Sequence, residues 1–227
     1  FNPKTGGYDF VELYNRSQKT IDLKSLRLAS YDNLENNYTS IKVISEDGFL
    51  IFPGEYLVLT EKPSVVRQQY YTSNDRGFLA MSSLPSYNDD AGKAILMNQN
   101  ENIIDLLEYN QDMHFPLLTT TDGVSLERIN PERPSDDATN WHSASEIVGF
   151  ATPAYENSQF KILSETDDRI TISPEVFSPD NDGFEDVVDI QLSFDNPGYV
   201  ANIKVFDSRG RLVKYIANNL LLGIENT

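Results

Sequence analysis

The chain is a succession of short segments in which apolar and polar residues alternate, separated by turn residues. Val11 and Leu13 fall on one face of such a segment with Glu12 on the other, and Leu26 and Leu28 repeat this spacing. A period of two is typical of a strand that buries one face and exposes the other. Because the segments are short and closely spaced, the sequence predicts an all-β chain folded as β-sandwiches.

The first 150 residues contain most of these predicted strands. We expect strands at residues 10–14, 25–30, 41–44, 49–52, 56–59, 93–97, 103–109 and 124–129. Residues 63–71 differ, because a proline near the start is followed by apolar residues at helical spacing. This pattern predicts a short surface helix, with a loop as the alternative.

The composition changes near residue 150 and marks a division of the chain. We predict a first domain at residues 1–157, an acidic linker at 158–171 and a second domain at 172–227. The second domain begins with predicted strands at 170–172, 187–194, 200–206 and 211–216, the last two joined by a hairpin turn with a glycine. Four strands in about 55 residues do not close a sandwich by themselves, so we expect an incomplete domain.

The charge and the composition exclude several classes of function. The chain has 18 Lys and Arg against 35 Asp and Glu, a net charge of −17, which repels nucleic acids and anionic lipid surfaces. There is no cysteine, which excludes disulfides, thiolate metal sites and a cysteine nucleophile. No apolar run reaches the roughly 18 residues of a membrane span, so we expect no direct membrane insertion. The start at Phe1, without Met, suggests a piece with flanking domains in a longer polypeptide.

The familiar catalytic and nucleotide-binding motifs are absent from the sequence. It contains neither a GxSxG elbow nor the glycine-rich phosphate loops GxGxxG and GxxxxGK[ST]. The two histidines, His114 and His142, lack metal-ligand spacing, and the Asp-Asp pairs at 89–90 and 136–137 fall in loop-like segments where adjacent side chains point apart. We therefore predict no catalytic residue, no cofactor-binding residue and no enzyme activity.

An acidic segment before the predicted strand 187–194 is the candidate metal site. Compared with a calcium loop, it places Asp180 at the third position, Asp182 at the fifth, the Phe184 carbonyl at the seventh, Asp186 at the ninth and Asp189 at the twelfth. A serine stands at the first position, and the twelfth residue is shorter than the usual Glu. The alternative to calcium binding is a solvated acidic turn in which Asn and Gly set the backbone geometry.

Several motifs of the first domain resemble those of a known family. They are FNPKTGGYDFVELYNRS at 1–17, IDLKSL at 21–26, FPGEYLVLT at 52–60, GVSLER at 123–128, NWHS at 140–143 and GFATP at 149–153. In order and spacing, residues 1–157 resemble a lamin tail domain of the bacterial, exported branch. The resemblance implies an Ig-like sandwich with protein or surface contacts and no catalytic residues. The family's first strand normally precedes the position of Phe1, and we hypothesise that another chain supplies it.

The second domain resembles a different family. The segments FSPDNDG at 177–183 and VFDSRGRLV at 205–213 are similar to the Ig-like C-terminal modules of Bacteroidetes exported and gliding-associated proteins, which are related to the flagellar hook-cap Ig domain. This likeness implies a second Ig-like domain and an exported protein.

Together these observations predict a noncatalytic β-sandwich module at the cell surface or in the extracellular medium. Its expected role is structural or adhesive, with a protein or a cell-surface polymer as the partner and no nucleic acid. The alternative is an accessory domain of a larger secreted hydrolase or nuclease whose catalytic part lies outside this chain.

Overall fold

The computed structural model describes residues 1–32, 36–115, 118–160, 170–174, 176–178, 180, 182–183, 186–194 and 196–226. These residues form β-strands with one short α-helix, which confirms the all-β class. The chain divides into two compact units, Phe1–Ile162 and Leu163–Thr227. The first unit thus includes the start of the predicted linker, whose residues 161–169 lie outside the described residues. Within the described ranges no helix has the length and hydropathy to cross a membrane.

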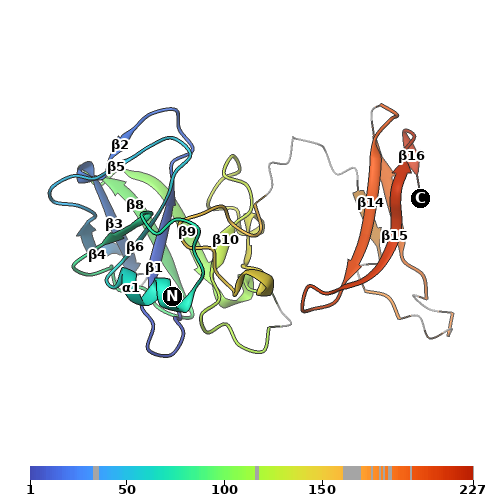
Figure 1. Cartoon of the computed structure of the whole chain (residues 1–227), viewed down its shortest axis with the longest axis horizontal. Coiled ribbons are helices and arrows are strands. Elements are labelled where there is room, and N and C mark those ends of the chain that lie inside the picture. The colour runs from blue at the N-terminus through green and yellow to red at the C-terminus, as the bar shows by residue number, and fades with distance from the viewer. Residues whose placement is uncertain are drawn as a thin grey trace. The chain divides into compact units, whose positions relative to one another are not determined.

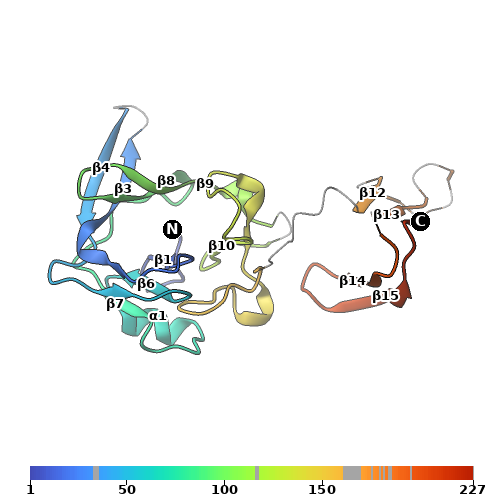
Figure 2. The same cartoon turned by 90° about the horizontal axis from the view of Figure 1, so that it is seen from above.

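The first unit is a sandwich of two facing sheets (Figure 1, Figure 2). One sheet has the order β1 (Phe10–Tyr14), β6 (Tyr56–Thr60), β7 (Phe78–Ala80), and the other β4 (Asn37–Val43), β3 (Leu26–Asp32), β8 (Ala91–Asn98), β9 (Ile103–Asn110). Two further pairs join β2 (Ile21–Asp22) to β5 (Leu50–Ile51) and β10 (Leu126–Arg128) to β11 (Trp141–Ser143). Short 3-10 helices lie at η1 (Leu23–Ser25), η2 (Gln111–Met113), η3 (Ala138–Asn140) and η4 (Glu146–Val148).

The alternation in the strands produces the core between these sheets. The inward apolar residues of β3 and β6 are almost completely buried and belong to one apolar cluster. The buried members of this cluster are Leu23, Leu26, Leu28, Ile44, Ile51, Leu57, Leu59 and Met81. Val11 and Leu13 of β1 pack against this cluster but stay partly accessible. The inner side of β1 is therefore only partly covered.

The predicted helix is confirmed as α1 (Pro63–Gln69), which covers the outer face of the β1–β6–β7 sheet (Figure 2). Pro63 stands in its first turn, where the missing N–H costs no hydrogen bond. Val66 is fully buried and packs with Tyr70 and Ala151, and Phe10 and Phe78 pack against the same cluster. The helix and the segment around Ala151 thus close this sheet from outside.

The second unit consists of a three-stranded sheet and a hairpin. The sheet has the order β12 (Ile170–Ser173), β13 (Asp189–Ser193), β16 (Glu225–Asn226), and the hairpin pairs β14 (Val200–Phe206) with β15 (Leu212–Leu221). Asp207 closes the predicted turn by accepting the N–H groups of Arg209 and Arg211, each at 2.9 Å. In the described part of this unit only Leu192 and Leu222 are buried apolar residues, so most of its apolar side chains face outward.

Candidate interaction site

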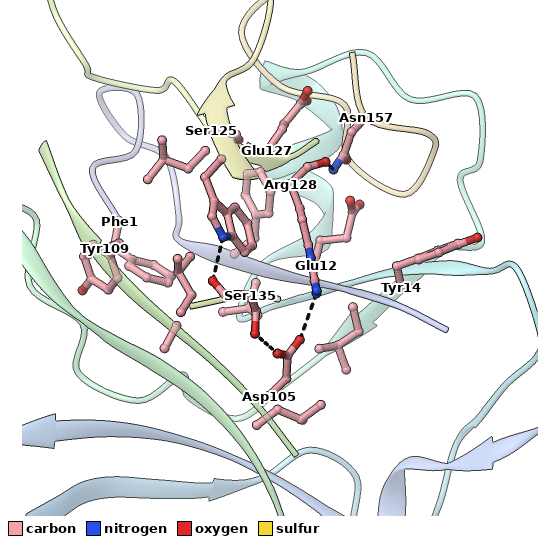
Figure 3. Close-up of a pocket in the computed structure, with 18 of the residues that line it drawn as sticks. Phe1, Glu12, Tyr14, Asp105, Tyr109, Ser125, Glu127, Arg128, Ser135 and Asn157 are labelled. Carbon is pink, nitrogen blue, oxygen red and sulfur yellow. Dashed lines mark hydrogen bonds and ion pairs between the residues drawn. The ribbon is translucent and has the colours of Figure 1, made fainter. Parts of the chain in front are cut away.

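A cleft of about 490 Å³ lies within the first unit, between β1, β9 and β10 (Figure 3). Its wall includes every residue of β1 and of β10, and residues 104–107 of β9. Successive side chains of a strand point to opposite faces, so a cleft that meets consecutive residues runs along the strand edge. The cleft is therefore a slot bordered by three strand edges. Its volume is in the range of ligand-binding pockets, roughly 300–1,000 Å³.

The β1 edge that borders the cleft is open. β1 pairs with β6 alone, and Val58 of β6 gives its own N–H to Gly77 on the far side, at 2.9 Å. Hydrogen bonding alternates along an antiparallel ladder, so Glu12, opposite Val58, directs its N–H and C=O away from β6. The same holds for Phe10 and Tyr14. Outside the β1–β6 ladder, no described residue hydrogen-bonds to the main chain of these three.

A polar group built around Arg128 forms one wall of the cleft (Figure 3). Arg128 Nη1 lies 3.2 Å from Asp105 Oδ2, and the Ser135 hydroxyl donates to the other oxygen of the same carboxylate. The Trp141 indole N–H donates to the Ser135 carbonyl at 2.8 Å, and Arg128 Nη2 donates to the Arg133 carbonyl. Arg128 Nε is buried and has no hydrogen-bond partner among the described residues, so this wall holds an unused donor.

Two glutamates anchor the segment that follows η4. Glu127 is 4% exposed and accepts hydrogen bonds from the Thr152 hydroxyl at 2.5 Å and the Ser158 hydroxyl at 2.7 Å. Glu12 accepts the Ala154 N–H at 2.6 Å. Burial raises the pKa of Glu12 to about 8, against the lowering effect of the Ala154 hydrogen bond and with a further increase from the Glu127 charge. Glu12 is thus mainly protonated at neutral pH.

The aromatic rings of Phe1 and Tyr109 line another part of the cleft (Figure 3), together with Asp9. The Phe1 ring stacks on Tyr87, with centroids 4.1 Å apart, and meets the edge of Tyr109 at 5.1 Å. Asp9 Oδ1 and the Tyr87 hydroxyl are buried without a hydrogen-bond partner in the described part of the chain. Burial raises the pKa of Asp9. This region combines apolar surface with an unused acceptor.

In the acidic segment predicted as a calcium loop, three of the five predicted ligand residues lie close together. Asp180, Asp182 and Asp186 each offer a carboxylate oxygen within 4.8 Å of the others. Asp189 is the first residue of β13 and does not belong to this group. The fifth predicted ligand, Phe184, lies outside the described residues. Calcium binding by this segment remains a prediction.

The Asp-Asp pairs considered in the sequence make local structural contacts. Asp137 accepts the Thr139 N–H at 2.9 Å as the cap of η3, and hydrogen bonds from Thr139 and Arg133 lower its pKa. Asp90 accepts a hydrogen bond from the Gln111 amide at 2.7 Å. Both Asp-Asp pairs lie outside helices and strands, in agreement with the predicted loop-like segments.

The histidines and the tryptophan are partly buried and contact neighbouring polar groups. His114 Nδ1 lies 2.9 Å from the Ser143 hydroxyl, and His142 Nδ1 lies 3.0 Å from the Ser143 carbonyl. Burial lowers the pKa of His114, with smaller effects from the N-terminal charge and His142. Trp141 is partly buried and lines the cleft.

The sequence analysis did not identify Glu12, Asp105 or Arg128 as site residues. Glu12 alternates with Val11 and Leu13 as a solvent-facing residue would, and that local pattern contains no sign of the distant segment that covers it. Arg128 belongs to the GVSLER motif, which was informative only through its likeness to a family.

Comparison with known proteins gives one match. The family model described as Lamin Tail Domain matches residues 1–111, which include β1 to β9. This supports the predicted lamin tail domain, which has an Ig-like and generally noncatalytic fold. No curated protein and no solved structure gives a significant match.

Proposed function

We propose that this chain is a noncatalytic interaction module whose first unit binds a protein partner in the cleft between β1, β9 and β10. The observation that carries the proposal is the position of this cleft, along open strand edges of a unit whose first 111 residues match a protein-interaction family. Strand edges offer main-chain hydrogen bonds, and the cleft offers apolar surface beside them. Both are features of protein recognition, and neither requires chemistry on a substrate.

The setting proposed for this module is the cell surface or the extracellular medium, with a structural or adhesive role. The likeness of residues 177–183 and 205–213 to Ig-like modules of exported Bacteroidetes proteins supports this setting. The net charge of −17 argues against nucleic acid as the partner. A second Ig-like domain would then hold the first unit away from the surface.

Affinity capture with the intact chain tests the interaction. The immobilised chain is exposed to cell-envelope and culture-medium fractions of the source organism, and each retained protein is purified and returned for a binding measurement. We expect a saturable interaction with a purified protein. Turnover of hydrolase or nuclease substrates by the purified chain would contradict the proposal.

The alternative is an accessory domain of a larger secreted hydrolase or nuclease. In that arrangement the cleft would bind a partner on behalf of the catalytic part of the same polypeptide. The sequence of the full-length polypeptide distinguishes the two, because a hydrolase motif outside these 227 residues favours the accessory role.

A further inference from the structure

We propose that residues 150–159, the strap, open from the sandwich as a unit, and that a rise in pH from about 6 to about 8 favours the open state. The strap follows η4 in the sequence, precedes the second unit and belongs to no helix or strand. The inference goes beyond the proposed function, because it concerns the strap alone and holds whatever the cleft binds.

Glu127 of β10 attaches the strap near both of its ends. It accepts hydrogen bonds from the Thr152 hydroxyl at 2.5 Å, the Ser158 hydroxyl at 2.7 Å and the Gln159 N–H at 3.2 Å. The Glu127 side chain belongs to a residue that is only 4% exposed, and a buried carboxylate that keeps only part of its donors is unfavourable. The three attachments are therefore expected to break together.

Glu12 of β1 attaches the middle of the strap and makes the attachment depend on pH. Its carboxyl group accepts the Ala154 N–H at 2.6 Å, and burial raises its pKa to about 8 from 4.5. When the strap opens, water reaches this carboxyl group and its pKa returns to the ordinary value. Between these two values the closed state binds one more proton than the open state, so a rise in pH favours opening.

The groups around Glu12 do not compensate for its ionisation. The charged and titratable side chains that face it are Glu127 of β10, Tyr56 of β6 and Tyr155 of the strap. Burial raises the pKa of both tyrosines, so their hydroxyl groups stay neutral. Within the described ranges Glu12 has no ion pair, and the neighbouring Arg128 is paired with Asp105 instead. Loss of the Glu12 proton thus adds a negative charge near Glu127.

The conformation of the strap also disfavours the closed state. Phe150 and Ala154 have φ angles of +72° and +69°, in the left-handed region that residues other than glycine rarely occupy. The buried residues of the strap are Ala151, Thr152, Pro153 and Ala154. Such small side chains remove little apolar surface from water, so the strap depends strongly on its hydrogen bonds to the two glutamates.

Hydrogen exchange of the intact chain, followed by NMR and corrected for the intrinsic rate at each pH, measures the opening. The Ala154 N–H reports the contact with Glu12, and the Gln159 N–H reports the contact with Glu127. With a pKa of about 8 in the closed state and 4.5 in the open state, the opening constant rises about fiftyfold from pH 6 to pH 8. We expect this change at both amides.

Low concentrations of urea distinguish opening of the strap from unfolding of the whole unit. Opening of so short a segment exposes little surface, so exchange at Ala154 and Gln159 is expected to depend only weakly on urea. Leu59 is completely buried in β6 and pairs with β1. Its N–H is expected to exchange through global unfolding, with a steep dependence on urea.

Glu12→Gln and Glu156→Gln are a matched pair of variants. The first keeps an acceptor for the Ala154 N–H but cannot ionise, and we expect it to abolish the pH dependence at both amides. Glu156 is an exposed acid of the strap, and its variant is expected to keep that dependence. Thr152→Val removes one donor to Glu127 and is expected to raise both exchange rates about tenfold at each pH.

Three results would overturn the inference. They are equal protection of the two strap amides at pH 6 and pH 8, a dependence on urea as steep as that of Leu59, and a pH dependence that survives in Glu12→Gln. A pH effect at Ala154 without one at Gln159 would contradict opening as a unit. Circular dichroism checks that the variants fold, and the pH and urea series on the parent chain tests the inference if one does not.

Discussion

At the residue scale, Glu12 shows how a covering segment changes the chemistry of an ordinary strand position. Its carboxyl group accepts the Ala154 N–H, and burial raises its pKa to about 8 from an ordinary 4.5. The folded state therefore holds this proton up to about pH 8, whereas the unfolded state releases it near pH 4.5. Between these values the free energy of unfolding falls as the pH rises, because the folded state binds more protons than the unfolded state.

Glu12→Gln tests this linkage, because the amide keeps an oxygen for the Ala154 N–H and cannot ionise. We expect the variant and the parent to have similar stability near pH 4.5 and the variant to be the more stable one at pH 9. Urea denaturation at pH 4.5, 7 and 9 measures the difference. Glu46→Gln is the control at an exposed position, and an equal pH dependence in both variants would show that Glu12 is not the linked group.

Asn140 is a second residue whose role follows from its contacts. It is fully buried; its amide group donates to the carbonyls of Asn130 at 2.9 Å and Pro134 at 3.1 Å, and its oxygen accepts the Asn130 N–H at 2.9 Å. Asn140→Ala leaves these main-chain groups unpaired in the interior and is expected to lower the free energy of unfolding by about 3 kcal/mol. Chemical denaturation measures the loss, with the exposed Asn100→Ala as the control. Equal stability of the two variants would contradict this role.

At the scale of elements, local sequence patterns were sufficient to locate a strand where that strand buries one face and exposes the other. Alternation placed β1, β6 and β9 correctly, and the proline at the start of a helical pattern placed α1. The sequence analysis missed β7, because three residues are too short for a period to be recognised and its parallel pairing with β6 depends on distant contacts. It also ended β15 too early. Asn218 and Asn219, the latter at φ +53°, interrupt the apolar pattern although the hairpin continues through register shifts to Leu221.

The acidic segment before β13 allows a test that separates its predicted ligands. If it binds calcium, titration gives a saturable heat, and the melting temperature rises, by the equivalent of about 2.7 kcal/mol at a hundredfold excess over Kd. Since Asp182 belongs to the three-carboxylate group and Asp189 does not, Asp182→Ala is expected to abolish both signals and Asp189→Ala to leave them. Calorimetry and melting with and without EGTA measure these effects. No heat at millimolar calcium would identify the segment as a solvated turn.

At the scale of the whole molecule, the cleft depends on information that no short segment contains. It forms because β1, β9 and β10, which are separated by many residues in the sequence, all border the same cleft. Each of them is at the edge of its own sheet. Strand patterns specify which face of a strand is buried, but which edge stays open depends on the complete strand order. The apolar core was thus predictable from alternation, whereas the site beside it required the tertiary structure.

The two compact units have cores of very different size, and this leads to a prediction about unfolding. Most buried apolar residues, Leu28 among them, lie in the first unit, whereas Leu192 and Leu222 are the buried apolar residues described in the second. Since burial of apolar surface is the main source of stability, we expect two calorimetric transitions, with the second unit melting at the lower temperature. Leu192→Ala should lower only the first transition on heating, and Leu28→Ala only the second, each through a loss of about 2–5 kcal/mol. One transition that both variants shift equally would instead mean that the chain unfolds as a single cooperative body.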